Sequence, residues 1–126
     1  MKRDMDLVRQ LSIEIEQEAE WPGGKCVAPE HASRSYHLHL LIQAGLVEGE
    51  ESQVLGGAPP RFLITGLTWQ GHEFLAASAD QDRWFRFKKS AGIALSSIPL
   101  PVITKLLTDG IESSVRSALK SHGFMS

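Results

Sequence analysis

The sequence predicts an α+β fold that is mostly α, in which a β-hairpin lies between helices. Apolar residues recur about one helical turn apart over residues 4–19 and again over residues 69–78. Between these segments, residues 47–68 alternate as two strands around a tip rich in glycine and proline. With 126 residues, of which 42% are hydrophobic, the chain can bury one core and is too short for two ordinary domains.

A first helix is predicted over residues 4–19. Its apolar face comprises Leu7, Leu11, Ile15 and Ala19. Residues 21–24, Trp-Pro-Gly-Gly, end this helix, because proline disfavours helical backbone in the residue before it and glycine is costly to order. We expect a turn there, followed by a short strand around Cys26 and Val27.

A second helix is predicted to begin near Pro29, with Ser33 or Ser35 as a capping side chain. Glycine adopts the left-handed conformation at low cost, so Gly45 can close this helix and let Leu46 fold back against it. Its broad apolar face comprises Tyr36, Leu38, Leu41, Ile42 and Ala44. We expect Leu38 and Leu41 to turn inward against the first helix.

Three more helical segments follow the hairpin. Thr68 resembles an N-cap, and the helix after it should run to about Ser78. Residues 80–89 form another predicted helix, in which an aspartate at the start faces the positive end of the helix dipole. Residues 96–101, Ser-Ser-Ile-Pro-Leu-Pro, interrupt the pattern. Apolar residues then repeat at helical intervals over residues 102–119, which predicts a C-terminal amphipathic helix.

The charge balance excludes a globally basic protein. Thirteen Lys and Arg against fifteen Asp and Glu give a formal net charge of −2, so any DNA contact must come from a local patch. The single cysteine, Cys26, allows no internal disulfide and no thiolate metal site, which is typical of a reducing compartment. Since neither a signal-peptide core nor an apolar run of about 18 residues is present, we expect a cytoplasmic protein with no membrane span.

Two resemblances point to a fold. The run SYHLHLLIQAGLV, residues 35–47, resembles the recognition helix and first wing strand of bacterial winged-helix regulators. The segments MKRDMDLVR (residues 1–9), YHL (36–38) and LTWQGHEFL (67–75) resemble the bacterial domain-of-unknown-function family 2513. These resemblances imply a winged helix-turn-helix domain over residues 1–78, with a two-stranded β-hairpin as its wing. Residues 79–126 would form a helical extension that packs on this domain or mediates self-association.

The chain departs from a typical winged helix at one place. A typical member has a separate helix between its first helix and its recognition helix. Only residues 21–30, which are mostly turn-forming, are available for it here. This departure argues against standard helix-turn-helix docking on DNA.

These resemblances are specific for the fold and not for the ligand, so they leave the activity open. We expect a DNA-binding transcriptional regulator or accessory factor of bacterial or prophage origin, acting on double-stranded DNA. Arg34 can contact a base edge or a phosphate, while Lys25 and Arg61 can contact the backbone from the wing side. The other candidates are polar side chains of the predicted recognition helix, namely Ser33, Ser35, Tyr36 and His39. A patch that neutralises only about three phosphates binds weakly, so useful affinity would require a dimer.

The alternative is a protein–protein interaction module that uses the winged-helix scaffold without binding DNA. Glu48, Glu50 and Glu51 on the predicted wing would repel a phosphate backbone. The aromatic residues of segment 80–89 and the apolar stripe of the last helix can cover a self-dimer interface, so we expect a homodimer through the C-terminal region. Those aromatic residues are Trp84, Phe85 and Phe87.

We expect no catalytic site, metal, cofactor or small-molecule ligand. His37 and His39 lie two residues apart, which on a helix points them about 200° from one another. We expect His37 at the edge of the core with a backbone partner and His39 exposed. Gly71-His72-Glu73 lies within an apolar helical pattern, and no nucleophilic residue stands at a spacing typical of a catalytic motif. The chain is therefore predicted not to be an enzyme.

Overall fold

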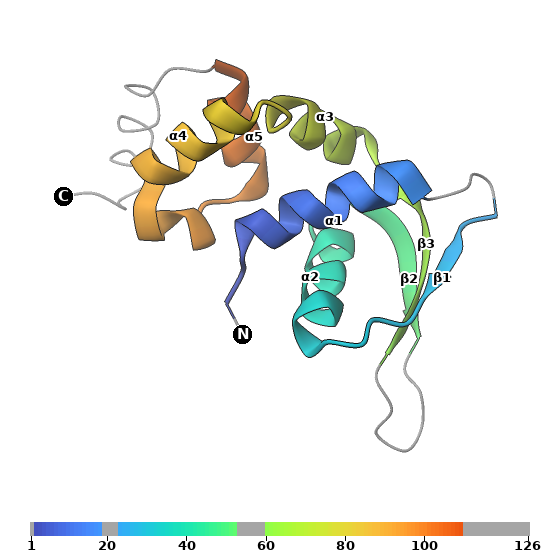
Figure 1. The fold of residues 1–126 in the computed structure, drawn as a ribbon. Coiled ribbons are helices and arrows are strands. Elements are labelled where there is room, and N and C mark those ends of the chain that lie inside the picture. Colours follow the sequence, from blue (N-terminus) through green and yellow to red (C-terminus); the bar gives the residue numbers. More distant parts are fainter. Residues whose placement is uncertain (1, 19–22, 53–59, 110–126) are drawn as a thin grey trace. The chain divides into compact units, whose positions relative to one another are not determined.

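The computed structural model describes residues 2–18, 23–52 and 60–109. Its elements in chain order are α1 (Met5–Glu18), β1 (Lys25–Val27), α2 (Ala32–Gln43), β2 (Val47–Ser52), β3 (Arg61–Leu67), α3 (Trp69–Ala77), α4 (Gln81–Ala91), the 3-10 helix η1 (Gly92–Ser96) and α5 (Leu100–Asp109) (Figure 1). The chain divides into two compact units, an N-terminal unit, Met1–His72, and a C-terminal unit, Glu73–Ser126. The predicted α+β class, mostly helical, is confirmed. The domain boundary after residue 78 stays a prediction.

The sheet of the N-terminal unit has three antiparallel strands in the order β1-β3-β2. β3 is the central strand, and it pairs with β2 from Val47–Leu67 to Ser52–Arg61. The hairpin predicted over residues 47–68 is therefore confirmed, although its tip, residues 53–59, lies outside the described residues. The short strand predicted around Cys26 pairs with the other edge of β3. The sheet thus has one strand more than the hairpin alone, because β1 satisfies hydrogen-bonding groups that β3 would otherwise leave open.

Two helices cover one face of this sheet (Figure 1). Helix α1 packs on β3 and on α2, and α2 packs on β2. The inward side chains of β3 are Phe62 and Ile64, while Leu63 between them is 40% exposed on the other face. Leu38 and Leu41 of α2 are 3% and 0% exposed, so they turn inward as predicted. The buried apolar face of α1 comprises Met5, Val8, Leu11 and Ile15.

The end of α2 and the start of α3 meet at a small hydrogen-bonded junction. Gly45 has a φ of +80° and ends α2, as predicted, and the Leu46 N–H donates to the Leu41 carbonyl at 3.0 Å. The Thr68 hydroxyl donates to the Gly45 carbonyl and accepts from the Gly71 N–H. Thr68 therefore caps α3 as predicted, and the same side chain attaches α3 to the end of α2.

One predicted cap is wrong. Helix α2 begins at Ala32, its N-cap residue is His31, and no side chain caps it. Ser33 and Ser35 lie inside the helix instead. The proline at position 29 remains outside it, because the segment between β1 and α2 has no regular structure.

The C-terminal unit has an aromatic core. The ring of Trp84 lies edge-on to Phe74 at 6.2 Å and stacks on Phe87 at 6.0 Å. Helix α4 packs on η1 and α5, and the Asp80 carboxylate caps it by accepting from the Arg83 N–H at 2.9 Å. Both predicted helices, over residues 80–89 and from residue 102, are present. The predicted continuation of the last helix to residue 119 lies outside the described residues.

Candidate functional site

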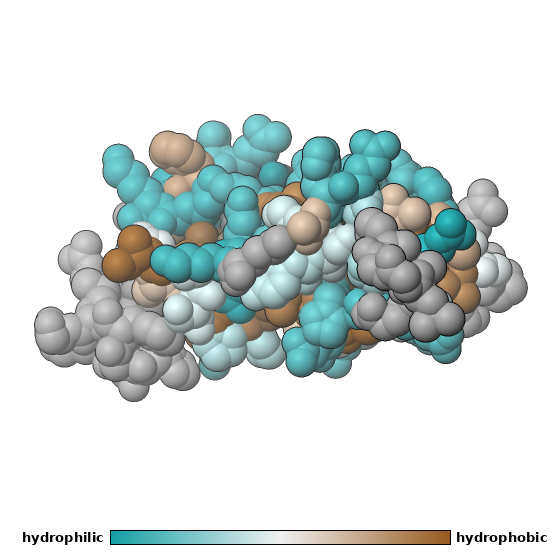
Figure 2. All heavy atoms as spheres, turned by 90° about the horizontal axis from the view of Figure 1, so that it is seen from below, coloured by the Kyte–Doolittle hydropathy of each residue, from teal (hydrophilic) through white to brown (hydrophobic). Residues whose placement is uncertain are grey.

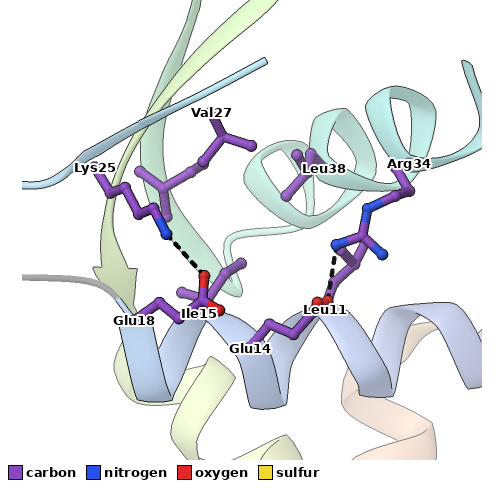
Figure 3. Close-up of a pocket in the computed structure, with 9 residues that line it drawn as sticks. Leu11, Glu14, Ile15, Glu18, Lys25, Val27, Arg34 and Leu38 are labelled. Atoms are coloured by element: carbon purple, nitrogen blue, oxygen red, sulfur yellow. Dashed lines mark hydrogen bonds and ion pairs between the residues drawn. The ribbon is translucent and has the colours of Figure 1, made fainter. Parts of the chain in front are cut away.

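A pocket in the N-terminal unit lies between α1, α2 and the sheet (Figure 3). It is lined by Leu11, Glu14, Ile15 and Glu18 of α1, Lys25 and Val27 of β1, Arg34 and Leu38 of α2, and Ile64 of β3. Five of these side chains are apolar and four are charged. The pocket has a volume of about 60 Å³. That is room for a small side chain and far below the roughly 300–1,000 Å³ of pockets that bind cofactors and drug-sized ligands.

Two ion pairs border this pocket, and each joins α1 to the element opposite (Figure 3). Arg34 Nη2 lies 2.8 Å from Glu14 Oε2, with the two side chains 38% and 32% exposed. Lys25 Nζ lies 2.9 Å from Glu18 Oε2, with both side chains more than half exposed. Pairs as exposed as these contribute at most about 1 kcal/mol of stability. Their larger effect is to neutralise Arg34 and Lys25, the two cations nearest the pocket.

The predicted DNA-contacting residues of α2 have different environments. Ser33 and His39 are exposed, Tyr36 is half-buried, and Ser35 is buried. Nδ1 of His39 lies 2.7 Å from Glu51 Oε2 on β2. Among the candidates on this helix, then, both Arg34 and His39 lie against a carboxylate.

The two DNA-contacting residues predicted on the wing side, Lys25 and Arg61, do not form one patch. Lys25 lies on β1 beside the pocket, and Arg61 begins β3. Arg61 is exposed and forms no ion pair with another described residue. β1 and β2 lie on opposite sides of β3, so Lys25 is not adjacent to the strand that carries the wing carboxylates.

His37 is 1% exposed and belongs to the core, with a backbone partner as predicted. Its Nε2 accepts from the Asp4 N–H at 2.7 Å, and its Nδ1 lies 2.7 Å from the Ser33 carbonyl oxygen. Since Nε2 is an acceptor and a carbonyl can only accept, the imidazole is neutral with its proton on Nδ1. His37 thus joins the start of α1 to α2 and is not available as a ligand.

Acidic residues outnumber basic ones in the N-terminal unit. Residues 1–72 carry ten Asp and Glu against six Lys and Arg, a formal net charge of −4. On β2, Glu48 and Glu50 are exposed and Glu51 is half-buried. Figure 2 shows hydrophobic residues as small separate patches among hydrophilic ones on the face that it draws. A phosphate backbone that approached β2 would meet carboxylates.

Sequence reasoning missed Glu14 and Glu18. They lie four residues apart, so they share one face of α1. Two carboxylates in this arrangement destabilise a helix by roughly 0.2–0.5 kcal/mol. Cations on an opposing element can compensate such a like-charge pair. The sequence did not show which cations these are, because Arg34 is 20 positions from Glu14.

The described residues form neither a metal-ligand cluster nor a membrane-spanning helix. Within residues 2–18, 23–52 and 60–109, no group of three His, Cys, Asp or Glu side chains is placed to hold a metal ion. None of the helices in these ranges combines the length and the apolar character that crossing a bilayer requires.

Comparison with known proteins identifies the family of this chain but finds no similar solved structure. A family model described as "Hypothetical protein (DUF2513)" matches residues 2–94. A protein of Haemophilus influenzae (strain ATCC 51907 / DSM 11121 / KW20 / Rd), described as "Uncharacterized protein", is 31% identical over 107 residues. That alignment covers 78% of this chain and 89% of the relative. No solved structure matches this chain.

Proposed function

The chain belongs to the DUF2513 family, and on that premise we propose that the protein is a winged-helix module whose acidic N-terminal unit binds a protein partner. The order helix, strand, helix, hairpin, helix supports the winged-helix assignment, as does the glycine that ends α2 directly before the hairpin. The module would act in the cytoplasm as an accessory factor, in a bacterial or prophage setting.

Among the described residues, no short helix stands directly before α2 as in a helix-turn-helix pair, which favours a protein partner over DNA. In a DNA-binding pair, the first helix crosses the backbone and the second enters the major groove. Here residues 28–31, the stretch between β1 and α2, contain no helix. The one helix that could enter a groove therefore lacks its usual companion.

The observation that carries the proposal is the pairing of Arg34 with Glu14 and of Lys25 with Glu18. Protein–DNA affinity depends on cations that replace the counterions of the phosphates. A cation already held by a carboxylate must give up that partner first. The exposed carboxylates of β2 add repulsion, and the N-terminal unit as a whole is negative.

The partner that fits this surface is a basic protein segment with one small apolar anchor. Lys or Arg side chains of the partner would face Glu48 and Glu50, since complementary charge favours association and excludes wrong partners. The pocket beside Leu38 and Ile64 would receive the anchor, because buried apolar contacts supply most of the affinity at the centre of an interface.

A random peptide array probed with the full chain tests this function. We expect the bound peptides to be enriched in Lys or Arg together with an aliphatic residue. The double variant Glu48→Gln/Glu50→Gln should bind them about tenfold more weakly, whereas Glu73→Gln, which removes an exposed carboxylate of the C-terminal unit, should not. Selection of acidic peptides, or equal binding by all three proteins, would contradict the proposal.

DNA binding through α2 is the second candidate. It is favoured by the N-terminus of α2, which has no capping side chain and no acidic residue in its first turn, and so leaves N–H groups open to a phosphate. Ser33 is exposed there, and Arg61 on β3 adds an exposed cation. Arg34 would have to exchange Glu14 for a phosphate.

Titration into duplex DNA at about 50 mM salt tests the second candidate. Arg34→Ala and Arg61→Ala should each weaken binding. Glu14→Gln should strengthen it, because that change frees Arg34 without removing volume from the pocket. Absence of binding by both the parent chain and Glu14→Gln would end this hypothesis.

Self-association through the C-terminal region is a third part of the proposal. Trp84 and Phe87 are buried within their own unit, so among the aromatic residues expected at a dimer interface only Phe85 is exposed. Ile93 of η1 is 97% exposed and would add a further apolar side chain to such an interface. Light scattering over a concentration series should show a dimer that Ile93→Ser weakens, and a monomer at every concentration would contradict it.

A further inference from the structure

The C-terminal unit has the opposite charge to the N-terminal unit. Residues 73–126 carry seven Lys and Arg against five Asp and Glu, a formal net charge of +2. Four of those cations lie on α4, which carries a single carboxylate, Asp82. The basic residues of α4 are Arg83, Arg86, Lys88 and Lys89. Positive charge is therefore concentrated on one helix of eleven residues.

Three of the four cations of α4 are exposed and lie outside its buried apolar face. Trp84 and Phe87 are buried, whereas Arg83, Arg86 and Lys89 are exposed. These three follow one another at intervals of three residues, so they are neighbours on the helix surface, about 4.5 Å apart along its axis. None of the three forms an ion pair with another residue in the described parts of the chain.

An aromatic ring lies among these cations. Phe85 is 63% exposed, although Phe is among the side chains most often buried. Lys89 follows it by four residues, one turn along the same face, and Arg86 lies between Lys89 and Arg83 around the helix. An exposed ring beside a row of cations is the arrangement with which proteins bind single strands, in which bases stack on aromatic side chains while cations track the phosphates.

We propose that this face of α4 is a binding site for single-stranded nucleic acid. Arg83, Arg86 and Lys89 contact consecutive phosphates, and an unpaired base stacks on Phe85. The site lies within residues 81–91 and is independent of the protein-binding surface of the N-terminal unit. It also differs from the α2 surface, because it recognises unpaired bases rather than a duplex.

The same observations disfavour two other polyanions. The bases of a duplex are already stacked on one another and offer no free face to Phe85. A membrane-surface helix needs a continuous apolar face that enters the lipid, and the apolar face of α4, with Trp84, Phe87 and Ala91, is buried in its own unit. Phe85 and Ile93 alone do not replace that face.

Fluorescence anisotropy with the full chain and a labelled oligothymidine of about 20 nucleotides tests the proposal. With three phosphates neutralised, the logarithm of the binding constant should fall against the logarithm of salt concentration with a slope of about −2. The double variant Arg86→Ser/Lys89→Ser should reduce this slope to about −0.7 and weaken binding by about tenfold or more. Lys105→Ser removes an exposed cation from α5 of the same unit and should change neither quantity.

The stacking part of the proposal has its own variants. Phe85→Leu should weaken binding by about tenfold with the salt slope unchanged, and Phe85→Tyr should restore it, because only the tyrosine retains a ring on which a base can stack. All these residues are exposed, so circular dichroism should show the same fold in every variant.

Four outcomes would overturn the site. The first is no binding of the oligonucleotide at about 20 mM salt, and the second is equal affinity for a duplex with no effect of Phe85→Leu. The third is binding to vesicles that contain phosphatidylserine but not to the oligonucleotide. The fourth is salt-sensitive self-association that Arg86→Ser/Lys89→Ser abolishes, in a chain that binds no oligonucleotide. The last outcome would assign the α4 face to the acidic unit of a second copy.

Discussion

At Gly71, the tertiary structure requires glycine although local helix propensity favours alanine. It lies in the first turn of α3, where helix propensity alone favours alanine over glycine by about 1 kcal/mol. A Cβ at this position would overlap with the carbonyl oxygen of Leu46, to which the Thr68 N–H donates at 2.9 Å. The glycine is thus required by the close approach of α3 to the chain that leaves α2.

Gly71→Ala should therefore destabilise the protein, by about 1–3 kcal/mol, although propensity predicts a gain. Urea unfolding followed by circular dichroism measures the change. Gly66→Ala on β3 is the matched control, because a Cβ there meets no atom within 4 Å. An increase in the stability of Gly71→Ala would mean that α3 does not approach Leu46 as described.

A substitution at Leu41 tests the inward packing of α2 against the sheet. It is 0% exposed and packs where α2 meets the sheet, so Leu41→Ala should lower the free energy of unfolding by about 2–5 kcal/mol. Leu63→Ala removes the same atoms from a side chain of β3 that is 40% exposed. It should lower the free energy of unfolding by less than about 1 kcal/mol. Equal effects of the two changes would contradict the inward packing of α2.

At the scale of elements, both ends of α4 have a local cause. The Asp80 carboxylate caps α4, and the hydrogen bond from the Arg83 N–H is the main reason that the pKa of Asp80 lies below its usual value. At the other end, Gly92 has a φ of +59°, and its N–H donates to the Lys88 carbonyl. Lys88 and Lys89 also lie in the last turn, where cations favour the negative end of the helix dipole.

The lowered pKa of Asp80 predicts how stability depends on pH. Because the folded value is below the unfolded one, the cap stabilises the protein above the unfolded pKa, near 3.8. That contribution is lost as the pH falls through the folded value. Thermal unfolding from about pH 5 downward should show a shallower decline for Asp80→Asn, whose amide still accepts the Arg83 N–H but does not titrate.

A second variant separates the charge from the cap. Asp80→Ala should be less stable than the parent at neutral pH and should also lack the titration. Identical pH profiles for the parent chain and Asp80→Asn would show that another carboxyl group causes the acid sensitivity.

For the whole molecule, the uneven charge distribution matters more than the net charge of −2. Charges separated by more than about 10 Å are largely screened at 0.1 M salt, so a polyanion responds to the local charge of α4 rather than to the total. The N-terminal unit presents the opposite sign. The two proposed sites would therefore take partners of opposite charge.

Ion-exchange chromatography at pH 7 measures this distribution without any chosen ligand. At low salt the chain should bind a sulfonate resin despite its negative net charge, and Arg86→Ser/Lys89→Ser should elute without retention. Lys25→Ser/Arg34→Ser removes the same charge from the N-terminal unit and should still be retained, because both cations are already paired. Equal loss of retention in both variants would show that net charge alone governs binding.

Local signals in the sequence determined the elements: apolar residues one turn apart in α1, the glycine at position 45, the Thr68 cap and the alternation along β3. These signals act through backbone preferences over a few residues, so they can be recognised without the fold. The family could be recognised too, from motifs that span residues 1–75.

Only the tertiary structure decided the partners of side chains that are distant in sequence. It placed Arg34 against Glu14, buried Ser35, and left Arg83, Arg86 and Lys89 of α4 exposed. Ion pairing and burial depend on which helix faces which, and that choice is made by the packing of the whole apolar core. A candidate cation in the sequence therefore becomes a candidate site only when its neighbours in space leave its charge exposed.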